Sequence, residues 1–210
     1  MIKPQIITKI ESQKKNPKRR SIFLDGKFAL GVDEEVVSRL GLKKGESVTG
    51  QDLKQILLQK NENEAKDVAL RFLSFRRRTE KEIRLKLQKR GFDEKIIKRT
   101  IEKLKEYDLI NDLEFATAWV KERLEYKPRG KRLLRLELWK KGIKKEIIDR
   151  VTGELCGEED KSVLELLEKI KKKYKNLDPQ VAKRRMYGYL MRRGFTYDLI
   201  NQVMRNSASK

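Results

Sequence analysis

One short motif occurs three times at an almost constant spacing, and it constrains the fold of this chain more than any other feature. The motif is a leucine, three variable residues, a glycine and an apolar residue, and its copies end at Gly91-Phe92, Gly142-Ile143 and Gly194-Phe195. The glycines are 51 and 52 residues apart. A period of this length indicates that one supersecondary unit is repeated and that neighbouring units complete each other's core.

The similarity between the three copies continues on both sides of the glycine. Two basic residues precede each glycine, and two aliphatic residues follow it at the fifth and sixth positions: Ile96-Ile97, Ile147-Ile148 and Leu199-Ile200. We therefore predict three helices in each unit, the second of which ends at the glycine in a left-handed cap. The first helices of the units are expected over residues 64–75, 112–126 and 159–175.

The first 60 residues have a different pattern. The β-branched stretch Ile6–Ile10 is typical of a strand, and Asp25-Gly26 between two apolar runs predicts a tight hairpin. We interpret Lys14–Arg20 as a basic connection between strands. Thr49, with an acidic residue three positions later, predicts the start of a helix.

These patterns together predict the fold class and the domain boundaries. We expect a mainly α protein with three tandem three-helix repeats in an elongated curved array, preceded by a small N-terminal β-hairpin/helix module. The expected domains are 1–60 for the N-terminal module, followed by the repeats over 61–110, 111–157 and 158–210.

The composition excludes several classes of enzyme. The chain has no His, so an imidazole base, a Ser-His-Asp triad and a His-ligated zinc site are impossible. Its one cysteine, Cys156, excludes a disulfide framework and is interpreted as a small buried residue. We expect no catalytic residues, no cofactor and no metal. No apolar run reaches the ~20 residues of a membrane span and no signal peptide is evident, so we expect a cytoplasmic monomer that does not enter membranes.

The charge of the chain is strongly positive, with 53 Lys and Arg against 32 Asp and Glu and a net charge of +21. The four expected domains carry net charges of +6, +5, +4 and +6 in chain order. A charge-rich surface of the kind found in heat-adapted proteins is the alternative interpretation, but such surfaces usually balance their signs. The excess therefore favours a long polyanionic partner.

A basic cluster lies near the start of the second helix in each unit. Arg side chains there suit phosphate, because their planar donors match its oxygens. Any one cluster is equally well explained as solvated surface, but their recurrence favours binding. The candidate binding residues are Arg71, Arg76, Arg77, Arg78, Lys81, Arg84, Lys127, Arg129, Lys131, Arg132, Arg135, Lys183, Arg184 and Arg185.

Two further groups have a structural interpretation. Trp119 and Trp139 are in apolar register on their helices, which indicates core positions. Asp108, Asp112 and Glu114 could bind Mg²⁺ in a nuclease, but helix capping explains Asn111 to Glu114 fully. We therefore keep the nuclease only as a minor alternative.

Several stretches of the chain closely resemble the RecX family. They are Ala69-Leu70-Arg71-Phe72-Leu73, Arg78-Thr79-Glu80 with Glu82-Ile83 and Arg90-Gly91-Phe92, Leu109-Ile110-Asn111-Asp112 with Phe115-Ala116, and Glu137-Leu138 with Lys141-Gly142-Ile143. The resemblance covers residues from about 64 to 205 and includes charged and turn positions as well as apolar ones.

The resemblance implies a function that spacing alone does not show. RecX proteins regulate the bacterial recombinase RecA in homologous recombination, DNA repair and the SOS response. The family implies docking into the groove of the RecA filament on single-stranded DNA, with inhibition of strand exchange and ATP hydrolysis. The expected partners are the RecA filament, the single-stranded DNA within it and, in addition, duplex DNA. The alternative is a general DNA-binding helical-repeat protein without a specific protein partner.

Overall fold

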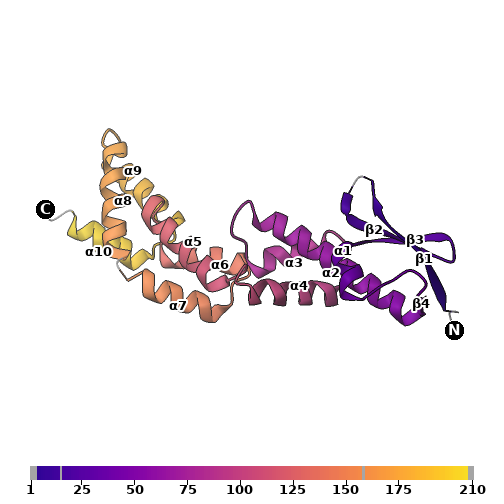
Figure 1. The fold of residues 1–210 in the computed structure, drawn as a ribbon. Helices are drawn as coiled ribbons and strands as arrows, with labels where there is room; N and C mark the ends of the chain where they lie inside the picture. Colours follow the sequence, from indigo (N-terminus) through magenta and orange to yellow (C-terminus); the bar gives the residue numbers. More distant parts are fainter. Residues whose placement is uncertain (1–3, 15, 158, 208–210) are drawn as a thin grey trace. The chain divides into compact units, whose positions relative to one another are not determined.

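The computed structural model describes residues 4–14, 16–157 and 159–207, which are mainly helical (Figure 1). The chain divides into two compact units. Unit 1 contains the chain up to Arg76 together with Ile83–Leu109, and unit 2 contains Arg77–Glu82 together with the chain from Ile110 onward. Among the helices of the described residues, none is both long and apolar enough to cross a membrane.

The elements follow one another from an N-terminal group of strands to a long series of helices. Within the described residues the strands are β1 (Gln5–Gln13), β2 (Asn16–Leu24), β3 (Lys27–Asp33) and β4 (Ser47–Val48). The helices are α1 (Glu34–Arg39), α2 (Gly50–Leu73), α3 (Glu80–Gln88), α4 (Glu94–Glu106), α5 (Asp112–Tyr126), α6 (Lys131–Lys140), α7 (Lys145–Leu155), α8 (Glu159–Tyr174), α9 (Pro179–Arg192) and α10 (Tyr197–Asn206). The predicted mainly α class with three three-helix units after an N-terminal strand module is confirmed.

The strands form one antiparallel sheet in the order β3-β2-β1-β4. Asp25 and Gly26 both have positive φ, 48° and 81°, at the turn between β2 and β3, which confirms the predicted hairpin. The interpretation of Lys14–Arg20 as a connection is wrong from Asn16 onward, because β2 begins there; Lys14 lies in the turn after β1, and Lys15 lies outside the described residues. Two of the basic residues of β2 are held by acidic side chains of other elements: Arg20 pairs with Glu34 of α1, and Arg19 reaches Glu64 of α2 at 3.4 Å.

A small core lies between this sheet and the helices beside it. Ile7, Ile22 and Val32 of the strands are fully buried with Val36 of α1 and Ile56 of α2. Figure 1 shows α1 and the start of α2 next to the strands. The sheet therefore depends on α2 for part of its core.

Helix α2 is one continuous helix of 24 residues, whereas the sequence indicated one helix from Thr49 and another over 64–75. Its start is confirmed, because Thr49 and Asp52 form a reciprocal capping box. The helix continues because no Gly or Pro occurs between positions 51 and 73.

The three glycines of the repeated motif end their helices as predicted. Gly91, Gly142 and Gly194 have φ of 81°, 85° and 91°. In each turn the backbone N–H of the residue after the glycine donates to the carbonyl oxygen of the motif leucine. The distances are 3.3 Å from Phe92 to Leu87, 3.1 Å from Ile143 to Leu138 and 3.4 Å from Phe195 to Leu190. The three leucines are fully buried, so each turn anchors its helix to a core.

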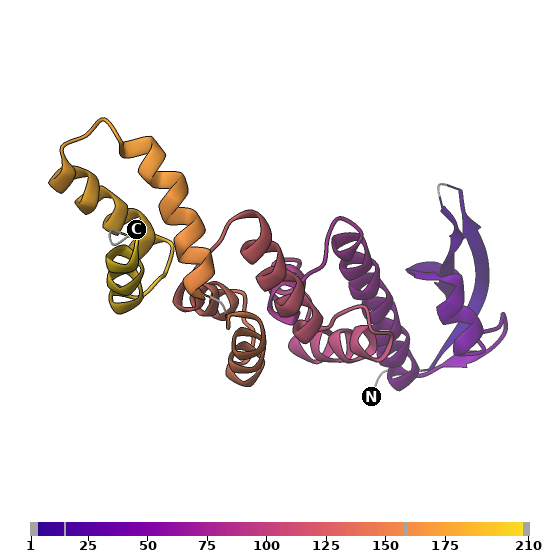
Figure 2. The same cartoon turned by 90° about the vertical axis from the view of Figure 1, so that its left-hand side faces the viewer.

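Unit 2 contains two such cores. The first combines Phe115, Val120, Leu134, Leu138 and Val151 of α5, α6 and α7. The second combines Val163, Leu167, Leu190, Phe195 and Ile200, and Figure 2 shows its helices α8, α9 and α10 grouped together in orange to yellow.

The two tryptophans have different environments. Trp119 is half-buried against the first core of unit 2, as predicted. The core assignment of Trp139 is wrong, because this side chain is 67% exposed. The equivalent residue, three positions before the glycine, is the exposed Gln88 in the first repeat, whereas in the third repeat it is Met191, which packs partly buried against the core.

Candidate nucleic-acid interface

The short segment Arg77–Glu82 belongs to unit 2 and is held there by the glycine turn of the second motif copy. The Thr79 hydroxyl donates to the carbonyl oxygen of Lys141 at 2.8 Å, and Lys81 Nζ donates to that of Lys140 at 3.3 Å. The Lys141 ammonium returns an ion pair to Glu82 Oε1 at 2.7 Å. Thr79 is fully buried. The basic cluster around it therefore has a structural role, since it connects the start of α3 to the glycine turn at Gly142.

The same joint occurs once more in unit 2. The Gly130 N–H donates to the carbonyl oxygen of Arg193 at 2.9 Å. Gly130 corresponds to Thr79 and Arg193 to Lys141 in the repeat. The approach is so close that a Cβ on Gly194 would lie 2.2 Å from Cβ of Leu133. In both places the start of the second helix of one repeat packs against the glycine turn of the next repeat. We call this contact the glycine-turn joint.

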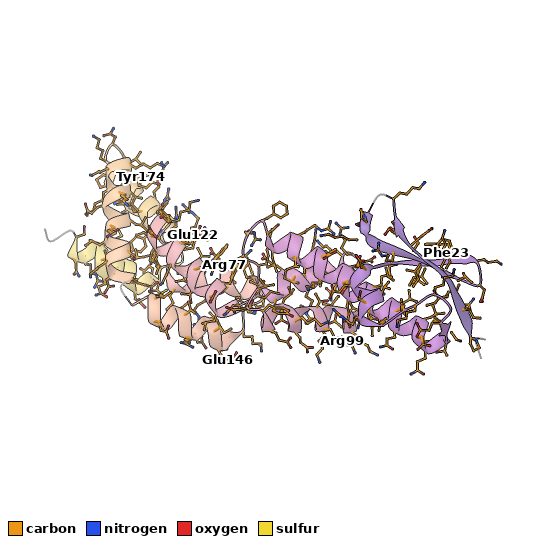
Figure 3. All side chains as sticks on the ribbon, viewed as in Figure 1. Phe23, Arg77, Arg99, Glu122, Glu146 and Tyr174 are labelled. Carbon is orange, nitrogen blue, oxygen red and sulfur yellow. The ribbon has the colours of Figure 1, made fainter. Side chains whose placement is uncertain are left out.

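Several of the predicted site residues form internal ion pairs. Arg77, labelled in Figure 3, contacts Glu114 at 3.4 Å, and Arg135 contacts Asp149 at 2.5 Å. Arg84 pairs with Glu94 within unit 1. Arg84 and Arg135 therefore help to hold their helices in place, and Arg77 connects the segment before α3 to α5.

Arg129 is a further internal residue. It is half-buried and pairs with Glu137. Burial lowers the pKa of its guanidinium, and the positive charges of Arg123 and Arg193 lower it further. Lys131 is also half-buried, and its backbone N–H donates to Glu159. Arg78, in the segment between α2 and α3, is half-buried.

The other predicted residues are exposed. They are Arg71, Arg76, Lys127, Arg132, Lys183, Arg184 and Arg185. The last three lie inside α9 and not before it, because α9 begins at Pro179, 15 residues before its glycine, whereas α6 begins 11 residues before Gly142. The third basic cluster is therefore on a helix face.

A hollow in unit 1 combines basic and aromatic side chains. It has a volume of about 220 Å³ and is lined by Val68, Arg71, Phe72, Phe75, Lys86 and Arg90. Phe75 is 81% exposed, and the Lys86 ammonium lies 5.2 Å from the centre of the Phe72 ring. We call it the Phe75 hollow.

A larger pocket in unit 2 has the same chemistry. It has a volume of about 610 Å³ and is lined by Arg132, Leu133, Arg135, Leu136, Trp139, Lys145, Ile148, Met191, Arg192 and Gly194. We call it the Trp139 pocket. Neither it nor the Phe75 hollow has an acidic lining residue. Arginine, lysine and exposed aromatic side chains are the groups that bind phosphates and stack on bases.

Most of these basic and aromatic groups were not predicted from the sequence; only Arg71, Arg132 and Arg135 were. Phe75, Lys86, Arg90, Trp139, Lys145 and Arg192 were not among the candidate residues. A signal was available for Trp139, because the equivalent Gln88 is polar and indicates an exposed position. Arg90 and Arg192 belong to the basic pairs that precede the glycines.

The acidic residues near residue 110 have structural partners. Asp112 Oδ1 accepts the Glu80 N–H at 3.0 Å, and the Asn111 side chain accepts from the N–H groups of Leu113 and Glu114. The predicted cap at Asn111 is confirmed. In the part of the chain that the structure describes, no group of three or more His, Cys, Asp and Glu residues is arranged to hold a metal ion.

Family models match nearly the whole chain. The model described as the regulatory protein RecX N-terminal domain matches residues 5–49. The models for the first, second and third three-helix domains of RecX match residues 65–104, 111–151 and 158–204.

Individual relatives and solved structures agree with these matches. The chain is 35% identical over 209 residues to the regulatory protein RecX of Clostridium acetobutylicum, covering 97% of each chain. It is 35% identical to that of Bacillus subtilis, covering 94% of this chain and 75% of the relative. A crystal structure of regulatory protein RecX superposes with a TM-score of 0.78 at 27% identity, over 96% of this chain and 99% of the other. RecX from Lactobacillus salivarius gives 0.61 at 27% identity, over 70% and 96%.

Proposed function

This chain belongs to the RecX family, and from that premise we propose that it is a non-enzymatic regulator of RecA. In this proposal it binds the filament that RecA forms on single-stranded DNA, lies in the groove of that filament, and inhibits strand exchange and ATP hydrolysis. The partners are RecA and the DNA strand that it coats, and the protein acts as a cytoplasmic monomer.

The observation that carries the proposal is the pair of basic, aromatic hollows. One lies in each unit, and both lack acidic lining residues. Other hollows of the described chain have acidic walls, such as the one lined by Asp33, Glu34 and Glu35. A nucleoprotein filament presents phosphates and acidic protein surface over a long distance, and two separate basic sites suit such a partner.

The chemistry of the remaining polar groups supports a role without catalysis. The carboxylates of Asp112 and Glu114 bind a backbone N–H and Arg77, respectively. Burial raises the pKa of the Cys156 thiol to about 11, so it is a poor nucleophile at neutral pH. These groups are already used within the fold.

Titration of the protein into a preformed filament of its cognate RecA tests the proposal. We expect the DNA-dependent ATPase rate and the yield of strand exchange to fall at amounts near stoichiometric with the filament. Filament length, measured in the same titration, separates filament shortening from blocking of the groove. If both activities remain unchanged at stoichiometric amounts, the proposed function is wrong.

The general DNA-binding alternative makes a different prediction. It requires tight binding to naked single-stranded or duplex DNA, with an affinity that falls steeply with salt as counterions are displaced. Weak binding to naked DNA together with strong binding to the filament would reject it.

A further inference from the structure

The Trp139 pocket exposes an apolar wall next to unpaired positive charge. Trp139 is 67% exposed and Leu136, one turn earlier on α6, is 44% exposed. Leaving an indole in water forgoes the burial energy that such a large side chain normally contributes. At the position of Trp139 in the repeat, the other two copies have Gln88 and Met191. An aromatic ring at this position is therefore specific to the second repeat.

The cations around the pocket are of two kinds. Arg135 is occupied, since it contacts Asp149 at 2.5 Å and the Thr152 hydroxyl at 3.3 Å. Arg132, Lys145 and Arg192 are exposed, and no described carboxylate forms an ion pair with any of them. They come from the first turn of α6, the first turn of α7 and the last turn of α9, and therefore surround the apolar wall from three elements.

The pocket is built on the glycine-turn joint of unit 2. Its lining includes Leu133 and Gly194, which pack so closely that a Cβ on Gly194 would overlap Leu133. The joint also includes the hydrogen bond from Gly130 to Arg193 at 2.9 Å. A preformed wall of this kind reduces the ordering cost when a ligand binds.

We propose that the Trp139 pocket binds an unstacked base of single-stranded DNA, with the base on the Trp139 ring and the flanking phosphates on Arg132, Lys145 and Arg192. A flat indole face stacks on any base, and three cations without carboxylate partners complement a phosphate backbone on either side of it. A duplex does not fit this role, because both faces of its bases are already stacked. This inference rests on the proposed function and deepens it, since it assigns a DNA contact to one site.

Substitution of the stacking ring in the full-length protein tests the proposal. Binding of a short labelled oligothymidylate is compared with binding of an abasic oligonucleotide of the same length. We expect Trp139→Ala to weaken oligothymidylate binding about 5- to 150-fold, the effect of losing one stacked base. Trp139→Phe retains most of the affinity, and neither substitution changes binding to the abasic strand.

Tyr126→Ala is the matched control, because Tyr126 is a 71% exposed aromatic on α5 that does not line the pocket. It should bind both strands as the unsubstituted protein does. Trp119→Phe leaves Trp139 as the only tryptophan of the chain, and its fluorescence should be quenched by oligothymidylate and not by the abasic strand. Circular dichroism checks that every variant is folded.

Two results would overturn the proposal. One is unchanged oligothymidylate binding by Trp139→Ala, and the other is an equal loss on both strands, which would point to charge or folding. If this variant loses affinity for free RecA and not for the oligonucleotide, the pocket docks an acidic protein segment and the assignment to a base is wrong.

Assays of the filament separate this inference from the proposed function. A protein that leaves the filament unaffected while Trp139→Ala still loses affinity for oligothymidylate would refute the function and leave the pocket assignment intact. Filament inhibition with no contribution from Trp139 in either oligonucleotide assay would refute only the pocket assignment.

Discussion

Glu62 shows how a single buried charge connects two helices of unit 1. Its carboxylate on α2 is 6% exposed and accepts hydrogen bonds from Arg99 at 2.8 Å and Lys103 at 3.0 Å, both on α4. Arg99 is labelled in Figure 3. Burial raises the pKa of Glu62, but these two cations outweigh burial and hold the pKa below its ordinary value.

We expect Glu62→Gln to lower the free energy of unfolding of unit 1 by about 1.5–3 kcal/mol at neutral pH, the contribution of hydrogen bonds to a charged group. Because the pKa of Glu62 is lowered by folding, its stabilisation is complete above the unfolded value of about 4.3 and is lost as the pH falls through the folded pKa. The difference between the two proteins should therefore shrink in acid. Urea unfolding at neutral pH and near pH 3 measures it.

Glu102→Gln is the control, since Glu102 is exposed on α4, the helix that carries Arg99 and Lys103. It should leave stability nearly unchanged. A loss for Glu62→Gln that stays constant over this pH range would contradict the role assigned to the ionised carboxylate.

Cys156 is a second residue whose environment decides its chemistry. Burial is the main cause of its raised pKa of about 11, and the nearby Glu159 carboxylate adds to it. At pH 8 only about one thiol in a thousand is then ionised, and the thiolate is the reactive form. We expect a thiol-specific disulfide reagent to label the native protein far more slowly than the denatured protein. Rapid labelling without denaturant would disprove this burial.

At the scale of the elements, the glycine turns share one conformation but have different surroundings. A Cβ on Gly91 would meet nothing within 4 Å, whereas a Cβ on Gly142 would meet the Lys81 side chain and one on Gly194 would meet Leu133. The cap is thus a local property of each helix, and the joint is an additional property of unit 2.

Alanine substitutions separate these two roles. Gly91→Ala should cost about 1–2 kcal/mol, the penalty of a left-handed conformation for a residue with a Cβ. Gly194→Ala should cost clearly more, because its Cβ would lie 2.2 Å from Cβ and 2.8 Å from the backbone nitrogen of Leu133. Urea unfolding of both variants measures the difference. Equal losses of unfolding free energy in the two variants would mean that the glycine-turn joint adjusts to the extra Cβ and contributes little to stability.

For the molecule as a whole, ion pairs within the chain leave the net charge of +21 unchanged, because each pair joins one cation to one anion. Many arginines are held by carboxylates, such as Arg77 by Glu114 and Arg135 by Asp149. Reversing the charge of such a residue removes its internal ion pair together with any contact to a partner, so the two effects are combined in one measurement. Exposed cations beside the hollows are therefore better probes of binding.

We expect Arg71→Glu combined with Arg90→Glu to weaken inhibition of the RecA filament roughly tenfold or more, because two cations of the Phe75 hollow become repulsive toward phosphate. Lys43→Glu with Lys44→Glu is the matched control, because both lysines are exposed and the change in net charge is the same. The protein concentration that halves the ATPase rate is the measurement. Equal weakening by both double variants would mean that only the total charge matters.

Features that depend on neighbouring residues could be predicted from the sequence. The glycine caps, the Thr49 and Asn111 caps and the Asp25-Gly26 hairpin all follow from short-range conformational preferences, and the 51- and 52-residue spacings predict three helical units. The first part of strand β2, Asn16–Arg20, was not predicted as a strand, because Arg19 and Arg20 are stabilised by Glu64 and Glu34, which lie outside the segment.

Only the tertiary structure decides which basic residues are held within the fold. The half-buried Arg129 pairs with Glu137, and the half-buried Lys141 pairs with Glu82, 59 positions away. Likewise, the exposure of Trp139 depends on which face of α6 packs on the core of its own repeat. Charge and side-chain type are local, but pairing and exposure arise from contacts between distant segments, which local periodicity does not specify.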